Sequence, residues 1–378
     1  MKTLFLFIVL IRLLFPLAAH ATNSVSLYSI KSAGVNVHLE KVKEGLGIPW
    51  GMVFISSSEL LVTERRGRVY IIDTRSGLKT AIKNIPGVLN DGQGGLLGVA
   101  IPPNYESTLW IYFTYVKEVA EQGVTVLARA KLKNNALTQW QELLVSISGS
   151  DSSQHFGSRI SFDETGHVYF GIGDRGERAN SQDLSNHAGT IIRLNLDGSI
   201  PKDNPFVGHT SALPEIWSYG HRNPQGLSYD FKTHQLWEIE HGPRGGDEVN
   251  LIFAGKNYGW PIISYGKEYW GPVAVGEGTH RKGMEQPKKV YTPSIAPGSL
   301  IVYSGNAFPN WTGNLFSGAL KLRHLNRLVL DDNKAVIKEE RLLLSLNERI
   351  RALAQSPRGW IYFSTDSGKI YRIKPYLK

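Results

Sequence analysis

Gly359-Trp360-Ile361-Tyr362 and Gly368-Lys369-Ile370-Tyr371 stand close together near the end of the chain, and this repeated unit decides the expected fold. The same unit occurs earlier, as Gly67-Arg68-Val69-Tyr70 and Gly166-His167-Val168-Tyr169. In each copy a glycine is followed, after one residue, by a branched aliphatic residue and a tyrosine. This pattern predicts a hairpin in which the glycine turns the chain and alternating apolar residues face neighbouring sheets. Helical periodicity is nearly absent elsewhere, so we expect an all-β protein.

Many antiparallel hairpins in a chain of 378 residues are best closed radially, because a propeller leaves only short, protected edges. At ~50 to 60 residues per blade, with room for long loops, six blades account for the length. A pair of β-sandwiches is the alternative architecture, but no Ser- or Pro-rich linker divides the chain near its middle. We therefore predict a single six-bladed β-propeller over residues 22–378.

The first residues have the pattern of a secretory signal. Lys2 provides a positive start, residues 4–17 form an apolar run interrupted only by Arg12, and Ala19-His20-Ala21 is a small-x-small cleavage site. A membrane anchor is the alternative, but the run is short for a span and contains a charge. We expect cleavage after Ala21, export to the periplasm or the medium, and no stable membrane insertion.

Composition narrows the possible partners and cofactors. The chain has no cysteine, which excludes disulfides, a thiolate metal site and a cysteine nucleophile. The formal net charge is +9, but the basic residues are spread along the chain without a run that interleaves with aromatics. We expect no nucleic-acid partner, and a small polyanionic cofactor or simple surface solvation accounts for the charge.

A glycine-rich loop, His241-Gly242-Pro243-Arg244-Gly245-Gly246-Asp247-Glu248, is followed closely by Asn257-Tyr258-Gly259-Trp260-Pro261. Backbone carbonyls free of bulky side chains lie beside an acidic pair in this region. Such an arrangement suits a hard, oxygen-seeking cation, and calcium is the expected one.

Two further segments carry polar residues at expected strand ends. A lone histidine such as His155 is usually a surface or hydrogen-bonded residue, but Asp174 lies one hairpin away. Its carboxylate could accept the imidazole N–H and fix the tautomer of a general base. In the second segment, Pro224 forces Asn223 to be extended, and Arg222 beside it suits an oxygen that becomes anionic during a reaction. A β-bulge with purely structural hydrogen bonds is the alternative there.

Other segments offer contacts to a flat or anionic ligand. Residues 91–98 are rich in glycine, but no βαβ unit surrounds them, so they are not a dinucleotide loop. Their glycines would allow a flat ligand to approach the backbone closely, with Gln93 as a hydrogen-bond donor. Arg349 and Arg351 are two apart in an expected strand and share one face, where they repel each other unless a polyanion lies between them. Together with Lys321 they form a possible anion site, and a solvated strand face is the alternative.

Taken in order, these segments resemble the soluble aldose sugar dehydrogenases of the glucose/sorbosone dehydrogenase family, which use pyrroloquinoline quinone (PQQ). The matching segments are residues 47–51, 92–98, 155–159, 221–226, 241–248 and 257–261, then Lys321 and residues 349–351. Each segment alone is weakly diagnostic, whereas the ordered set is specific and covers most of the chain after residue 21. The resemblance implies a six-bladed propeller with PQQ in a cleft on top.

The resemblance also implies roles for individual residues. His155 would be the general base, oriented by Asp174. Arg222 and Asn223 would contact the reacting quinone carbonyl. The remaining cofactor contacts would come from Gln93, Tyr269, Lys321, Arg349 and Arg351. Backbone oxygens of Gly242 and Pro243 would hold the calcium that touches PQQ, and Glu248 with the Tyr258 carbonyl would hold a second, structural calcium.

The implied function is PQQ- and calcium-dependent oxidation of an aldose sugar at C1 to the lactone, with electrons passed to an external acceptor. The alternatives are a calcium-dependent sugar lactonase and a non-catalytic carbohydrate-binding propeller. A lactonase needs calcium ringed by side-chain carboxylates, and a binding module needs neither His155 nor the basic residues. The family's Ala-Pro-Ser stretch reads Ala296-Pro297-Gly298-Ser299 here, which puts cofactor contacts from this loop in doubt. The physiological sugar, the natural acceptor and the oligomeric state are not determined by the sequence.

Overall fold

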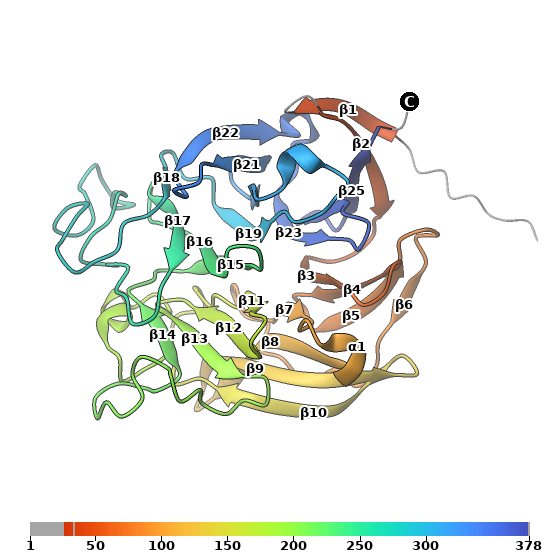
Figure 1. Ribbon diagram of the computed structural model, residues 1–378. Coiled ribbons are helices and arrows are strands. Elements are labelled where there is room, and N and C mark those ends of the chain that lie inside the picture. Colours follow the sequence, from red (N-terminus) through yellow and green to blue (C-terminus); the bar gives the residue numbers. More distant parts are fainter. Residues whose placement is uncertain (1–25, 33–34, 377–378) are drawn as a thin grey trace, which may run out of the picture.

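The computed structural model describes residues 26–32 and 35–376. The described chain forms six antiparallel sheets arranged around a central axis (Figure 1). The six-bladed β-propeller predicted from the repeated hairpins is therefore confirmed, and the pair of β-sandwiches is excluded. The expected signal peptide over residues 1–21, with its cleavage after Ala21, lies outside the described residues.

Five blades are four-stranded meanders in chain order. The first two contain β3 (Pro49–Phe54), β4 (Glu59–Glu64), β5 (Arg68–Asp73) and β6 (Lys79–Ala81), and β7 (Leu96–Ala100), β8 (Trp110–Val119), β9 (Gln122–Lys133) and β10 (Ala136–Val145). The next two contain β11 (Ile160–Phe162), β12 (His167–Ile172), β13 (Thr190–Asn195) and β14 (Ile216–Tyr219), and β15 (Pro224–Asp230), β16 (Gln235–Glu240), β17 (Asp247–Ile252) and β18 (Lys289–Tyr291). The fifth contains β19 (Pro297–Val302), β20 (Leu315–Ala319), β21 (Leu325–Leu330) and β22 (Val336–Leu342).

The sixth sheet joins the two ends of the described chain. It contains β23 (Ile350–Gln355), β24 (Ile361–Thr365) and β25 (Ile370–Pro375), and its outer edge is extended by β2 (Val35–Lys43) and β1 (Ser26–Ser32). Because β2 pairs with β25, with Leu39 opposite Ile373, the ring is closed by hydrogen bonds between distant parts of the sequence. In Figure 1 the red and dark blue strands accordingly lie side by side. Radial closure leaves only short edges open to other chains.

The repeated units form hairpins as expected. Gly368 lies in the turn between β24 and β25 with a φ of 79°, and a β-carbon there would overlap the Leu46 carbonyl oxygen. Glycine is therefore required for both the backbone conformation and the close approach. The only α-helix of the described residues, α1 (Tyr105–Thr108), is a single turn, and short 3₁₀ segments occur as η1 (Arg178–Gln182), η2 (Pro309–Trp311) and η3 (Leu344–Leu346). No helix in the described part of the chain is long and apolar enough to cross a membrane.

The first strand of each blade, from β3 to β23, lines the central axis, where neighbouring blades contact one another. Arg159 ties these strands together. Its guanidinium group donates to backbone carbonyls of Trp50 (2.8 Å), Gln225 (3.0 Å), Gly298 (2.6 Å) and Arg351 (3.0 Å), which belong to four other blades. It also stacks on the Trp50 ring at 3.9 Å. These charge-assisted bonds fix the relative positions of the strands that carry the candidate site.

Candidate active site

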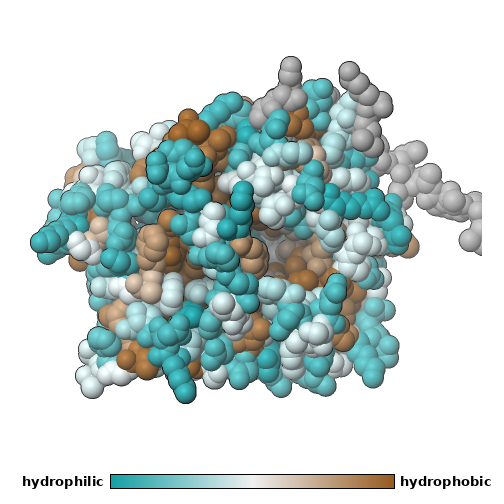
Figure 2. Space-filling model, viewed as in Figure 1, coloured by the Kyte–Doolittle hydropathy of each residue, from teal (hydrophilic) through white to brown (hydrophobic). Residues whose placement is uncertain are grey.

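Three of the predicted cofactor residues, Gln93, Arg349 and Arg351, line a cavity near the start of β3. This cavity has a volume of about 200 Å³ and is lined by Trp50, Arg65, Gln93, Leu97, Phe156, Gly157, Gln225, His241, Leu320, Arg349 and Arg351. A larger cavity of about 910 Å³ lies where β3 ends and is lined by Phe54, Ile55 and other mostly apolar residues. Figure 2 shows one face of the propeller, hollowed near its centre, where apolar side chains gather. None of the predicted catalytic or cofactor residues lines the larger cavity, so its size does not make it the candidate site.

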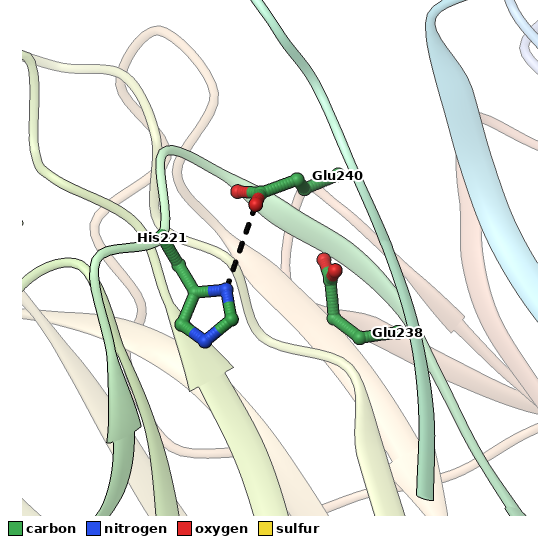
Figure 3. A group of neighbouring side chains, drawn as sticks. All are labelled: His221, Glu238 and Glu240. Carbon is green, nitrogen blue, oxygen red and sulfur yellow. Dashed lines mark ion pairs between the residues drawn. The ribbon is translucent and has the colours of Figure 1, made fainter. Parts of the chain in front are cut away.

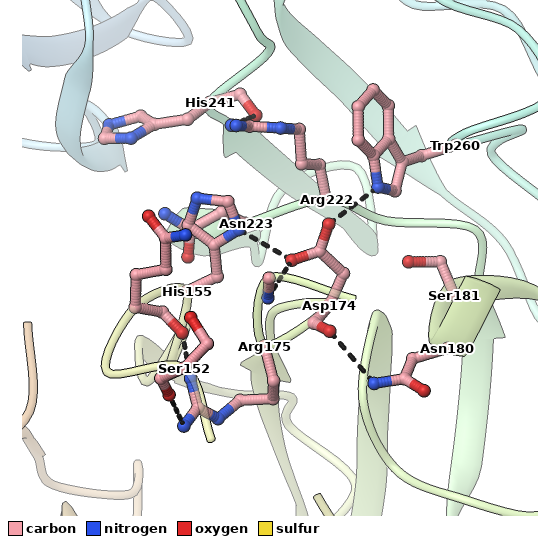
Figure 4. A network of polar contacts seen from close by, with 12 residues as sticks. Ser152, His155, Asp174, Arg175, Asn180, Ser181, Arg222, Asn223, His241 and Trp260 are labelled. Carbon is pink, nitrogen blue, oxygen red and sulfur yellow. Dashed lines mark hydrogen bonds and ion pairs between the residues drawn. The ribbon is translucent and has the colours of Figure 1, made fainter. Parts of the chain in front are cut away.

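His155 and Asp174 form the pair predicted from their spacing (Figure 4). Nδ1 of His155 lies 2.6 Å from Oδ1 of Asp174, and both side chains are buried. The loop before β11 and the residues after β12 meet because these two strands are antiparallel neighbours. Oδ2 of Asp174 accepts a hydrogen bond from Nε1 of Trp260 at 2.8 Å, which fixes the carboxylate. With Nδ1 donating to the carboxylate, Nε2 is the nitrogen that can accept a proton.

The surroundings keep the imidazole neutral. Burial lowers the pKa of His155, and this effect outweighs the hydrogen bond to Asp174, which raises it. Burial alone would raise the pKa of Asp174, but the hydrogen bond from His155 and the nearby Arg222 bring it below its ordinary value. A neutral imidazole held by a carboxylate anion is the arrangement required of a general base.

Arg175 holds the loop that carries His155. Its guanidinium group donates to the backbone carbonyls of Gln154, Ser152 (2.7 Å) and Gly123 (3.1 Å) and lies over the ring of Phe156. The sequence did not point to Arg175, because its partners are backbone carbonyls of a loop whose conformation cannot be read from the sequence.

Gln93 contacts the same loop. Its Oε1 accepts a hydrogen bond from the backbone N–H of His155 at 2.9 Å. Because this oxygen already accepts a hydrogen bond, the amide nitrogen is the group that can donate into the cavity, and its donation to a ligand remains a prediction.

Arg222 and Asn223 stand between β14 and β15, beside the His155–Asp174 pair. Glu240 accepts hydrogen bonds from both of their backbone N–H groups, at 2.6 and 3.2 Å. A β-bulge interrupts the start of β15, between Pro224 and Gly226, so the structural alternative is present as well. Nδ2 of Asn223, however, is buried without a hydrogen-bond partner among the described residues. A buried donor without an acceptor is costly, and a carbonyl oxygen of a bound ligand would satisfy it.

The predicted calcium loop is tightly fixed. Asp247 accepts hydrogen bonds from the backbone N–H groups of Gly242 (3.0 Å) and Ala296 (2.7 Å), and burial raises its pKa to about 6. The Gly242 carbonyl oxygen accepts from Arg222 Nη1 at 2.8 Å, and that of Pro243 accepts from a serine hydroxyl at 3.3 Å. Each carbonyl has a second lone pair, so two adjacent oxygens remain able to bind a hard cation. The residues present therefore fit calcium.

The second predicted calcium pair, Glu248 and the Tyr258 carbonyl, belongs to β17 and the loop that follows it. Glu248 lies opposite Glu240 of β16, and burial together with that neighbouring carboxylate raises the pKa of Glu248 well above its ordinary value. A cation would relieve the repulsion between the two carboxylates. Calcium at this position remains a prediction.

Arg349 and Arg351 share one face, as expected, and both bind the same carboxylate group of the protein. Asp366 lies between them, accepting from Nε of Arg349 at 2.8 Å and from Nε and Nη2 of Arg351 at 2.8 and 3.0 Å. A protein carboxylate, rather than only a bound polyanion, therefore separates the two guanidinium groups. Asp366 lies 17 positions after Arg349 and 15 after Arg351, in the turn between β24 and β25, and no motif in the sequence points to it.

Arg65 is a further cavity residue that the sequence analysis missed. It follows β4 directly, and β4 ends beside the start of β3 because Glu64 pairs with Pro49. Its Nε is buried without a partner among the described residues. Burial and the nearby Arg351 lower its pKa. The sequence offered one indication of this residue, since a charged side chain directly after a predicted strand often lies at the end of a sheet where a ligand can reach it. Three arginines and one carboxylate, Asp366, thus leave this region positively charged, which suits an anionic ligand.

Two predicted cofactor residues are less involved. Lys321 is exposed, and Tyr269 is 65% exposed and does not line the cavity.

The departure from the family's Ala-Pro-Ser stretch at residues 296–299 has a steric reason. A β-carbon at Gly298 would lie 2.7 Å from the backbone oxygens of Ile350 and Arg351, so no side chain fits. The Pro297 carbonyl instead accepts a hydrogen bond from Nε2 of His241 at 2.7 Å.

Known proteins resemble this chain over most of its length. Aldose sugar dehydrogenase YliI of Escherichia coli is 34% identical over 354 residues, which cover 91% of this chain and 94% of that protein. Quinoprotein glucose dehydrogenase B of Acinetobacter calcoaceticus is 26% identical and covers 89% of this chain and 87% of its own length.

Solved structures give the same result. The apo-form of the soluble aldose sugar dehydrogenase from Escherichia coli superposes with a TM-score of 0.86 at 32% identity, covering 90% of this chain and all of that one (100%). The PQQ-bound aldose sugar dehydrogenase from Streptomyces coelicolor superposes with a TM-score of 0.74 at 26% identity, covering 89% and 98%. The family model described as Glucose / Sorbosone dehydrogenase matches residues 46–372. This chain belongs to the glucose/sorbosone dehydrogenase family.

Proposed function

We propose that this protein is an exported, PQQ- and calcium-dependent dehydrogenase. It oxidises aldose sugars at C1 to lactones and passes the electrons to an external acceptor. The observation that carries the proposal is the buried His155–Asp174 pair beside a cavity with arginines on its walls. The similarity to an aldose sugar dehydrogenase of Escherichia coli and to the PQQ-bound enzyme of Streptomyces coelicolor supports the choice of an aldose donor and of PQQ.

The chain's own groups fit the two cofactors. PQQ carries carboxylates and an ortho-quinone. Arg349, Arg351 and Lys321 would pair with the carboxylates, and the unpaired Nδ2 of Asn223 would donate to a quinone oxygen. Calcium would be held by the carbonyl oxygens of Gly242 and Pro243. When bound, the quinone supplies the hydride acceptor and calcium supplies a Lewis acid.

The protein residues would perform the proton transfer and the electrostatic stabilisation. Nε2 of His155 takes the proton of the anomeric hydroxyl as hydride leaves C1. Asp174 holds the imidazole in the required tautomer and stabilises the cation that forms. Arg222, fixed by the carbonyls of His241 and Gly242, lies ready to stabilise negative charge that develops on an oxygen.

The cavity disfavours the two alternatives. None of the residues that line it is an aspartate or a glutamate, whereas a calcium-dependent lactonase needs several carboxylates around its metal. A non-catalytic carbohydrate-binding propeller has no need for a buried histidine held by a carboxylate.

The decisive experiment is reconstitution. Purified apo-protein receives PQQ, calcium or both, and reduction of an artificial dye is followed after addition of an aldose. We expect dye reduction only with both cofactors and the sugar present. Hydrolysis of a sugar lactone by the cofactor-free protein, without dye reduction under any condition, would instead identify a lactonase.

The pH dependence of this activity follows from the burial of His155. Because its pKa lies below the ordinary value of 6.5, the neutral base persists as the medium becomes mildly acidic. Activity is then lost only as the pH falls through the lowered pKa. We expect the acidic limb of kcat/KM, measured with PQQ and calcium saturating, to lie below pH 6.5. A limb at or above that value would contradict the assignment of His155 as the base.

A further inference from the structure

A second cluster of charged groups lies outside the cavity. His221 follows β14, and Glu238 and Glu240 stand two apart on β16, so that their side chains share one face. The three side chains point toward one another (Figure 3). Their candidate ligand atoms all lie within 4.8 Å of one another, and all three residues are buried. None of them lines the cavity described above.

Two atoms in this cluster are unpartnered. Nδ1 of His221 and Oε1 of Glu238 are buried without a hydrogen-bond partner among the described residues, and both residues are 0% exposed. Nδ1 of His221 is 3.5 Å from Oε1 of Glu240, too far for a well-formed hydrogen bond. On the other side of the ring, Nε2 of His221 lies 2.9 Å from the Ser218 hydroxyl. A histidine whose outer nitrogen is hydrogen-bonded presents its inner nitrogen as a metal ligand does.

The charges in the cluster also lack compensation. No lysine or arginine of the described residues forms an ion pair with Glu238 or Glu240. Glu240 accepts hydrogen bonds from the backbone N–H groups of Arg222 and Asn223 through one oxygen, Oε2. Glu238 accepts only from Asn250, at 3.1 Å. Buried carboxylates without a cationic partner are costly, and proteins either protonate them or bind a metal ion with them.

We propose that Nδ1 of His221 and the carboxylates of Glu238 and Glu240 bind one divalent ion of borderline hardness, such as Zn²⁺. A ligand set of one imidazole nitrogen and two carboxylates suits zinc, whereas calcium prefers six to eight oxygens. The ion would connect β16 to the turn between β14 and β15. That turn carries Arg222 and Asn223, so the bound metal would stabilise the position of both residues. The site shares no ligand residue with either expected calcium site, Gly242 with Pro243 or Glu248 with the Tyr258 carbonyl, although Glu240 lies opposite Glu248. Calcium is therefore kept saturating in the test below, so that zinc is measured at a site that calcium does not fill.

The test measures metal binding and stability, in the absence of PQQ and sugar, so that its outcome does not depend on the proposed activity. The protein is stripped of metal, saturated with calcium, and titrated with ZnCl₂ against a competing indicator. We expect about one tight equivalent of zinc and a rise in Tm on zinc addition, since a metal that binds only the folded chain stabilises it.

Two variants remove ligands while preserving shape. Glu238→Gln keeps the size of the side chain, and His221→Phe keeps the ring that stacks on Tyr258 at 4.6 Å. Each should weaken zinc binding at least ~10- to 100-fold and abolish the zinc-dependent rise in Tm. Glu215→Gln is the matched control, because Glu215 faces the buried His187 at 3.6 Å without a second carboxylate in the group. Its zinc affinity should equal that of the unchanged protein.

The contrary result is equally definite. If the unchanged protein binds zinc no more tightly than Glu238→Gln, the carboxylates share protons instead of a metal ion, and the proposal is wrong. Should either variant fail to fold, substitution of Co²⁺ into the unchanged protein decides the matter. Cobalt held by nitrogen and oxygen ligands absorbs visible light strongly when its geometry is tetrahedral. Absence of that absorption at one equivalent, together with no rise in Tm when zinc is added to the unchanged protein, would overturn the proposal.

Discussion

His155→Gln is expected to lower turnover ~10²- to 10⁴-fold at saturating PQQ and calcium, because removal of a general base typically costs that much. Glutamine keeps the approximate size of the side chain but cannot take up a proton near neutral pH. The residue is not expected to bind the carboxylates of the cofactor, so PQQ affinity should change little. The measurement is a dye-reduction assay with an aldose, together with a PQQ titration of each apo-protein.

His167→Gln is the matched control for this prediction. His167 lies in the same blade and forms the same type of pair, with Nδ1 2.7 Å from Oδ2 of Asp163. His155 is followed directly by the cavity residues Phe156 and Gly157 and its backbone binds Gln93, whereas His167 lies on β12 away from the cavity. Its loss tests whether removing any histidine–carboxylate pair disturbs the blade enough to lower turnover. Near-normal turnover of His155→Gln, or an equal loss in both variants, would rule out His155 as the base.

The sequence predicted the His155–Asp174 pair because the two residues flank one hairpin. Residues at the open ends of β11 and β12 are brought together by the pairing of those strands alone. Trp260, which fixes the same carboxylate, is 86 positions away from Asp174. Its indole N–H reaches the pair only because blades 3 and 4 are neighbours in the ring. Patterns in a single sequence do not show which residues of neighbouring blades come into contact.

The same contrast explains the fold. Period-two alternation and glycine turns specify each hairpin locally, so the number of blades could be inferred from the length. The hydrogen bonds that close the ring, between β2 and β25, join residues more than 300 positions apart. Arg159 was included in a matching segment without a role, because its partners are backbone carbonyls of four other blades. Backbone acceptors leave no side-chain signal in a sequence.

Charge at the cavity was predicted only in part. The sequence indicated basic residues but neither their counter-ion, Asp366, nor Arg65, whose buried Nε has no partner among the described residues. Asp366 reduces the net positive charge that Arg349 and Arg351 offer to a ligand. An anion that enters must therefore compete with a protein carboxylate for both guanidinium groups, and the affinity it gains from each is smaller than that of a free arginine.

Arg351→Gln is expected to raise the PQQ concentration needed for half-reconstitution ~10-fold. One charge-assisted hydrogen bond is worth roughly 1.5 to 3 kcal/mol, or ~10- to 150-fold in affinity, and competition from Asp366 places the effect at the lower end of that range. Arg349→Gln should have a smaller effect, because its side chain is 45% exposed and solvent screens it, whereas that of Arg351 is 12% exposed. Turnover at saturating PQQ should change much less than affinity in both variants. Titration of apo-protein with PQQ, followed by dye reduction, measures both quantities.

Two controls separate cofactor binding from structural pairing. Arg372→Gln removes an arginine that pairs with Glu40 at 2.6 Å in the same sheet but away from the cavity, and it should leave PQQ affinity unchanged. Asp366→Asn removes the carboxylate that holds both cavity arginines and should not weaken PQQ binding, because the guanidinium groups then face the anion without a competitor. If Asp366→Asn weakens binding as much as Arg351→Gln does, the arginines act by fixing the sheet through Asp366. If the PQQ concentration for half-reconstitution is unchanged in both arginine variants, neither residue contacts the cofactor. The positive charge of the cavity would then no longer support a quinoprotein.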